Sequence, residues 1–133
     1  MSRFEDPEKF GPLKETLAKW EVMCTAANGK YLFGTDEPTL LDSHAGAIMD
    51  YVYTFLTSDG SAFKAFVEAV NAKDYPNFLA YCEKLRAHPL IAPYRIRKNA
   101  MDKYMARAQN WEKGVKCQLN LEDVSEDLFV AEP

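Results

Sequence analysis

The chain has 133 residues, of which 47% are hydrophobic and 27% charged, a composition typical of one ordinary globular domain. Its net charge of −4 argues against general binding of nucleic acid, because binding a polyanion needs a concentrated basic surface. We expect no membrane span, since no apolar run approaches the ~18 residues required. Residues 1–7 also lack the apolar core of a secretory signal.

The cysteines and histidines do not form a recognisable chemical motif. Cys24, Cys82 and Cys117 are odd in number, far apart and without C-x-x-C spacing. We therefore predict reduced thiols in the cytoplasm, with an organelle left open as the other location. His44 and His88 lack the spacing of metal ligands, so we expect no metal and no catalytic residues.

The chain begins with an irregular lead-in, expected over residues 1–11 because Pro7 and Gly11 lie among charges. A first helix is predicted over residues 12–28, because Pro12 suits a first helical turn and Asn28-Gly29 suits a helix end. The apolar residues of this segment recur at helical spacing: Leu13, Leu17, Trp20 and Cys24.

A second helix is predicted over residues 39–57, and we expect it to lie in the hydrophobic core. Thr39 suits the N-cap, and Asp42 can reach back to the Thr39 N–H to complete a capping box. The only formal charges are Asp42 and Asp50, so we expect a core helix covered on two sides. One apolar side recurs at helical spacing: Leu41, Ala45, Ile48, Val52 and Phe55. The neighbouring side is apolar or amphipathic too: Leu40, His44, Ala47 and Tyr51. We expect a hydrogen-bonded structural role for His44.

Two further helices follow after the turn at Ser58-Asp59-Gly60-Ser61. The first is expected over residues 61–72. The second starts at Asp74-Tyr75-Pro76, with Asp74 as its cap, and ends at His88 before Pro89. We expect the His88 ring to satisfy the last carbonyls of this helix. The inner stripe of the helix is Phe78, Leu79, Cys82 and Leu85.

The last third of the chain carries a basic amphipathic helix, predicted over residues 98–112 and ended by Gly114. Its apolar stripe includes the candidate interface residues Met101, Tyr104, Met105 and Trp111, because Met adapts to irregular surfaces and Trp anchors interfaces. Residues 115–133 alternate apolar and acidic side chains, a composition that by itself would also allow disorder. We expect these residues to form a docking tail. A weaker hypothesis assigns RNA binding to the basic cluster: Arg86, His88, Arg95, Arg97, Lys98, Lys103 and Arg107.

Two segments carry a family resemblance. Residues 31–42, YLFGTDEPTLLD, and residues 75–94, which close with HPLIAPY, resemble the C-terminal all-helical domain of cytosolic glutathione S-transferases over about residues 12–94. The resemblance implies an all-α bundle in which Thr39 and Asp42 cap a buried helix. Both roles are structural. Residues 95–133 would then be an additional helix and an acidic-apolar docking tail.

The resemblance also implies what this chain lacks. The family binds glutathione mainly on an N-terminal thioredoxin-like domain, which has no counterpart here, and the bundle lacks or truncates its first helix. An apolar face should therefore remain open, to be buried by another chain or by residues 98–112. We predict a non-catalytic interaction module without a cofactor, whose partners are other protein chains in a homodimer or larger assembly. The alternative is the C-terminal part of a glutathione transferase, which conjugates glutathione to apolar electrophiles, with its thioredoxin-like domain missing or on another chain.

Overall fold

A computed structural model of the chain describes residues 7–57 and 64–92. The predicted helix 98–112, the candidate interface residues Met101, Tyr104, Met105 and Trp111, and the tail lie outside the described residues. Within the described ranges all regular structure is helical, which confirms the all-α class. The α-helices are α1 (Gly11–Ala27), α2 (Leu40–Leu56), α3 (Lys64–Ala69) and α4 (Pro76–Ala87), with 3-10 helices at Pro7–Phe10 and Ala72–Asp74.

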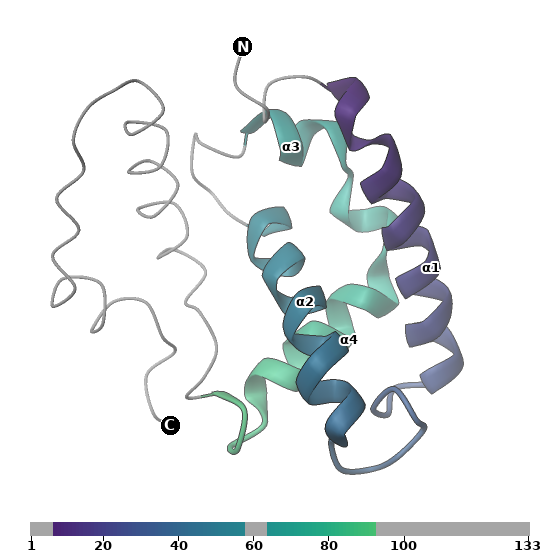
Figure 1. Cartoon of the computed structure of the whole chain (residues 1–133), viewed down its shortest axis with the longest axis vertical. Helices are drawn as coiled ribbons and strands as arrows, with labels where there is room; N and C mark the ends of the chain where they lie inside the picture. Colours follow the sequence, from purple (N-terminus) through teal and green to yellow (C-terminus); the bar gives the residue numbers. More distant parts are fainter. Residues whose placement is uncertain (1–6, 58–63, 93–133) are drawn as a thin grey trace, which may run out of the picture.

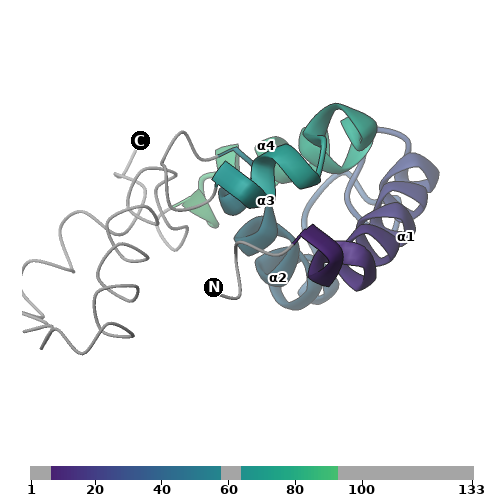
Figure 2. The same cartoon turned by 90° about the horizontal axis from the view of Figure 1, so that it is seen from above.

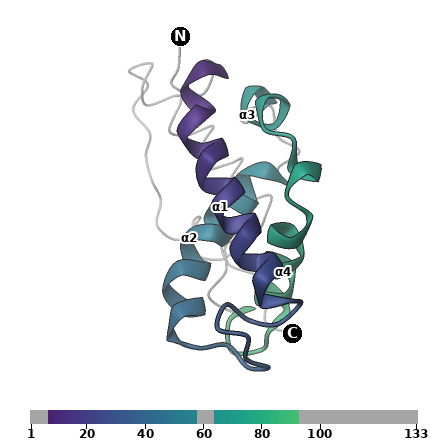
Figure 3. The same cartoon turned by 90° about the vertical axis from the view of Figure 1, so that its right-hand side faces the viewer.

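The three longer helices surround a common core (Figures 1 and 2). Helix α4 packs against both α1 and α2, and α3 closes one end by contacting α2 and the 3-10 helix at Pro7–Phe10. Seen from the side, α1 crosses in front of α2 and α4 (Figure 3). The core therefore lies between α1, α2 and α4.

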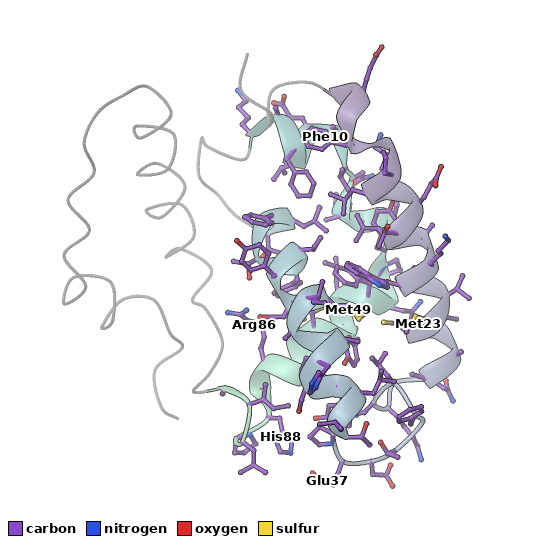
Figure 4. All side chains as sticks on the ribbon, in the orientation of Figure 1. Phe10, Met23, Glu37, Met49, Arg86 and His88 are labelled. Atoms are coloured by element: carbon purple, nitrogen blue, oxygen red, sulfur yellow. The ribbon has the colours of Figure 1, made fainter. Side chains whose placement is uncertain are left out.

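The prediction of an irregular lead-in is wrong for its last residues. Pro7–Phe10 forms a 3-10 helix that runs directly into α1 at Gly11. The Phe10 side chain is buried and meets the Phe66 ring of α3 edge-to-face at 5.3 Å between centroids. Figure 4 shows Phe10 at the end of the bundle where α1 and α3 meet. A hydrophobic anchor thus fixes this segment, although its composition suggests a loop.

The apolar stripe predicted for α2 is confirmed at Val52 and Phe55, which pack half-buried against the core, but it is wrong at Ile48. The structure buries Asp42, Gly46, Met49 and Tyr53, whereas the side chain of Ile48 is 63% exposed. Figure 4 shows Met49 on the side of α2 that faces α1. The reason lies at Gly46, which has no side chain and so lets α4 approach closely. A Cβ atom there would lie 2.7 Å from Leu85 Cδ2 and 2.8 Å from the Tyr81 hydroxyl oxygen.

The start of α4 is capped from another helix. Asp74 was expected to cap it, but Asp74 ends the preceding 3-10 helix, and the N-cap position is Tyr75, whose side chain makes no capping bond. Instead, the Glu21 carboxylate of α1 accepts the backbone N–H groups of Asn77 (3.0 Å) and Phe78 (2.7 Å). A residue 56 positions away thus replaces the local cap.

Candidate interaction surface

The N-terminus of α2 is fixed by a capping box at Thr39 and Asp42. The Thr39 backbone N–H donates to Asp42 Oδ2 at 2.8 Å, and the Thr39 hydroxyl donates to the same oxygen at 3.1 Å. The other carboxylate oxygen accepts the Leu32 N–H (3.1 Å) and the Tyr81 hydroxyl of α4 (2.8 Å). One side chain therefore joins the connector, α2 and α4.

The Asp42 side chain is fully buried, yet it is held as a carboxylate. Burial by itself raises its pKa. The hydrogen bonds from the Thr39 and Leu32 backbone, the Tyr81 hydroxyl and the Thr39 hydroxyl outweigh that effect, so the pKa of Asp42 is lowered below its ordinary value. Because all four donors favour the charged form, this carboxylate is a structural anchor rather than a proton donor at neutral pH.

The second acid of α2 is also buried and satisfied. Arg86 of α4 places its Nη1 atom 2.9 Å and 3.0 Å from the two carboxylate oxygens of Asp50. The Asp50 side chain is 5% exposed and that of Arg86 only 11%. Arg86 belongs to the cluster considered for RNA, and this ion pair turns it toward α2, where it contributes little to a basic surface.

Because both acids of α2 point inward, its outer side carries no charge along Leu40–Leu56. We call the stripe of Leu40, His44, Ile48 and Tyr51 the α2 outer face. The side chains of Leu40, Ile48 and Tyr51 are 76%, 63% and 42% exposed. The His44 ring is exposed as well, and its Nδ1 lies 3.2 Å from the carbonyl oxygen of Leu40. This side of α2 is therefore an exposed apolar strip among the described residues.

The end of α4 lies beside the connector that leads into α2 and is bound to it through His88. The Nε2 atom of His88 lies 3.0 Å from a carboxylate oxygen of Glu37, in the connector that precedes α2, and the His88 ring meets the Tyr31 ring edge-to-face. Figure 4 shows His88 and Glu37 together at this end of the bundle. The His88 ring was expected to bind the last carbonyls of α4, but its Nδ1 accepts the Leu90 N–H and its other nitrogen pairs with Glu37.

A pocket of about 270 Å³ lies between the end of α1 and α4, lined in part by Cys24, Lys30 and Lys84. Burial, and next the nearby Glu21 carboxylate, raise the pKa of the Cys24 thiol to about 12. This thiol therefore stays protonated at neutral pH and is a poor nucleophile. Both lysines are engaged within the chain: Lys84 donates to the Gly29 carbonyl, and Lys30 pairs with Asp36. At neutral pH the Cys24 thiol is thus protonated, and Lys30 and Lys84 each bind a group of the chain itself.

Two further properties bear on the kind of site. In residues 7–57 and 64–92, no three His, Cys, Asp or Glu side chains gather closely enough to hold a metal ion. None of the described helices combines the length and the apolarity needed to cross a bilayer. Among the described residues, the α2 outer face brings together Leu40, Ile48 and Tyr51, three of the large apolar side chains that are exposed.

Comparison with known proteins gives no relative: no protein-family model, curated protein or solved structure matches the chain. The likeness to the glutathione S-transferase helical domain therefore remains a prediction from two sequence segments.

The sequence predicted the capping box of α2 but not the α4 side chains that bind the two acids of α2. The capping box was readable, because Thr39 and Asp42 are close in the chain. The partners Tyr81 and Arg86 were missed, because each lies more than 30 residues from the acid it contacts. The available signal was the pair of acids in an otherwise apolar helix, since buried carboxylates require partners.

Proposed function

We propose that this chain is a non-catalytic helical interaction module, a subunit or adaptor that binds an apolar helix of another protein on the α2 outer face. The observation that carries the proposal is a 17-residue helix whose only charged residues are buried, while Leu40 and Ile48 are largely exposed. A helix that faces water normally carries charged side chains on its outer side.

The resemblance to the helical domain of glutathione S-transferases gives this proposal a structural context. A bundle of that kind without its first helix would leave an apolar flank on the capped central helix. The exposure of the α2 outer face agrees with such a flank. The same geometry suits a docking unit within a larger assembly, including one formed with a second copy.

The proposal is tested by the size of the particle that contains the chain in extracts of its source cells. We expect it to migrate well above its own mass of 15.1 kDa, and to return to that mass when Leu40→Lys and Ile48→Lys are introduced together. Val22→Lys is the matched control, because Val22 is 69% exposed on α1. Migration of the native chain as a monomer would overturn the proposal.

The second candidate is the C-terminal part of a glutathione transferase. The capped, buried Asp42 favours it, because the resemblance assigns this role to the central helix of that family. The test is to read the neighbouring coding sequence for a thioredoxin-like domain and to assay the joined protein for conjugation of glutathione to an apolar electrophile. Absence of such a domain would remove this candidate.

A further inference from the structure

The pocket between the end of α1 and α4 carries chemistry that the proposed function does not use. Its volume of about 270 Å³ is close to the lower limit of about 300 Å³ for pockets that bind small molecules. Its wall on α4 consists of residues at helical spacing: Asn77, Ala80, Tyr81 and Lys84. The facing wall includes Gly29, just after α1, where an added Cβ atom would have nothing within 4 Å. The space therefore exists because Ala80 and Gly29 bring almost no side chain into it.

Lys84 brings a positive charge to this pocket. Its side chain is half-buried, and its Nζ atom donates to the Gly29 carbonyl oxygen at 2.7 Å and lies 4.7 Å from the centre of the Tyr31 ring. Both of these partners are neutral groups. Within residues 7–57 and 64–92, no carboxylate lies at ion-pair distance from Lys84. Because an ammonium group has three N–H donors, one remains for a ligand.

The carboxylates that contact the pocket lining are already bound within the chain. Lys30 pairs with Asp36 at 3.1 Å, and half of its side chain stays exposed. Glu21 accepts three hydrogen bonds at the start of α4. Asp42 accepts four, one of them from the Tyr81 hydroxyl. The donors left to the pocket are therefore the lysine ammonium groups, which suit an anionic oxygen.

The rest of the lining is less polar. Ala80 offers a methyl group, and the Cys24 thiol behaves as a small apolar group when it is protonated. The Tyr81 hydroxyl already donates to Asp42, which leaves its ring as lining. A ligand that suits both parts has one negative charge and a short apolar body.

We propose that this pocket binds a small carboxylic acid as its anion, with a carboxylate oxygen accepting from Lys84 and the apolar body lying against Ala80 and Tyr81. The pocket lies apart from the α2 outer face. This inference therefore goes beyond the proposed function and does not depend on it.

The experiment uses benzoate as the probe and benzamide, which has nearly the same shape without the charge, as its control. The purified, isotope-labelled full-length chain is titrated with each compound at neutral pH, and its backbone amides are followed by NMR. We expect millimolar benzoate to shift the signals of Gly29, Lys30 and Ala80 until they saturate. Benzamide should bind about tenfold more weakly, because it cannot form a charge-assisted hydrogen bond to Lys84.

Three variants test the assignment of the groups. Lys84→Met keeps most of the aliphatic chain but removes the ammonium group, so benzoate should bind about tenfold more weakly. Lys19→Met removes the same charge from the exposed side of α1 and should leave binding unchanged. Ala80→Leu keeps both lysines but fills the pocket, so binding should be lost.

Three outcomes would overturn the inference: no saturable shift at the lining residues, equal affinity for benzamide and benzoate, or an affinity unchanged by Lys84→Met. If Lys84→Met prevents folding, the benzamide comparison and Ala80→Leu decide, and benzoate binding that survives Ala80→Leu contradicts the inference. The measurements do not involve the α2 outer face. They can therefore fail while the large particle in cell extracts persists, and they can succeed without it.

Discussion

The inner and outer sides of α2 belong to one helix but are built differently. The inner side combines Met49 and Tyr53 with two buried acids. Tyr81 of α4 donates to Asp42, and Arg86 of α4 pairs with Asp50. The outer side presents Leu40 and Ile48 to solvent, without charge. The inner side therefore has one specific partner arrangement.

The comparison shows that hydrophobicity alone does not decide which face of a helix enters the core. Ile48 is as apolar as Met49, yet one is 63% exposed and the other 0%. Gly46 decides between the faces, because the missing side chain allows Leu85 and Tyr81 of α4 to approach. Once α4 is seated there, Asp42 and Asp50 obtain their hydrogen bonds, and the side carrying Ile48 is turned away.

The largest expected effect separates the two faces directly. Met49→Ala should reduce the free energy of unfolding by about 2–5 kcal/mol, because it leaves a cavity at a fully buried site. Ile48→Ala, one residue along, should cost about 1 kcal/mol or less because most of that side chain is exposed. Urea denaturation of both variants measures the difference, and equal losses would contradict the assignment of the faces.

Removing the charge of Asp42 should have the next largest effect. Asp42→Asn keeps the shape but weakens four hydrogen bonds to a buried carboxylate, so we expect a loss of about 2–3 kcal/mol at neutral pH. Thr39→Ala, which removes only one hydroxyl of the capping box, should cost about 1 kcal/mol.

The same carboxylate should make stability depend on pH. Its pKa in the folded chain is lowered, so its stabilisation is fully present above the unfolded pKa of about 4 and is lost as the pH falls through the folded value. Urea denaturation at a series of acidic pH values should show this loss in the native chain and a smaller one in Asp42→Asn. Parallel curves would mean that Asp42 is not a source of the acid sensitivity.

A smaller effect concerns the close approach at Gly46. Alanine favours helix over glycine by about 1 kcal/mol, but overpacking typically costs about 1–3 kcal/mol. We therefore expect Gly46→Ala to lower the melting temperature, since its Cβ would meet Leu85 and Tyr81. Gly11→Ala is the control, because nothing lies within 4 Å of a Cβ atom there. A higher melting temperature for Gly46→Ala would show that α4 can shift away.

The smallest expected effect tests the cap supplied by α1. Glu21→Ala removes the acceptor for two free N–H groups at the start of α4 and should cost about 0.5–2 kcal/mol. Glu15→Ala, on the exposed side of α1, should change stability by less than about 0.5 kcal/mol. Thermal melting followed by circular dichroism distinguishes the two variants. An unchanged melting temperature in Glu21→Ala would show that the cap on α4 does not stabilise the fold.

Much of the fold was readable because its signals are local. Helical spacing predicted α1, α2 and α4, and the capping box predicted the start of α2, since Thr39 and Asp42 are three residues apart. The cap of α4 was predicted wrongly at Asp74, because its true acceptor, Glu21, comes from another helix. The candidate interface at Met101, Tyr104, Met105 and Trp111 stays a prediction, because these residues lie outside the described ranges.

By itself the sequence determined an all-helical chain, the bounds of its longer helices within a few residues, and an α2 that carries almost no charge. Those properties follow from the periodicity and capping chemistry of neighbouring residues. Only the tertiary structure decided which side of α2 is buried and which acid meets which partner. Both depend on the approach of α4 at Gly46, a contact between segments about 35 to 40 residues apart that no local pattern encodes.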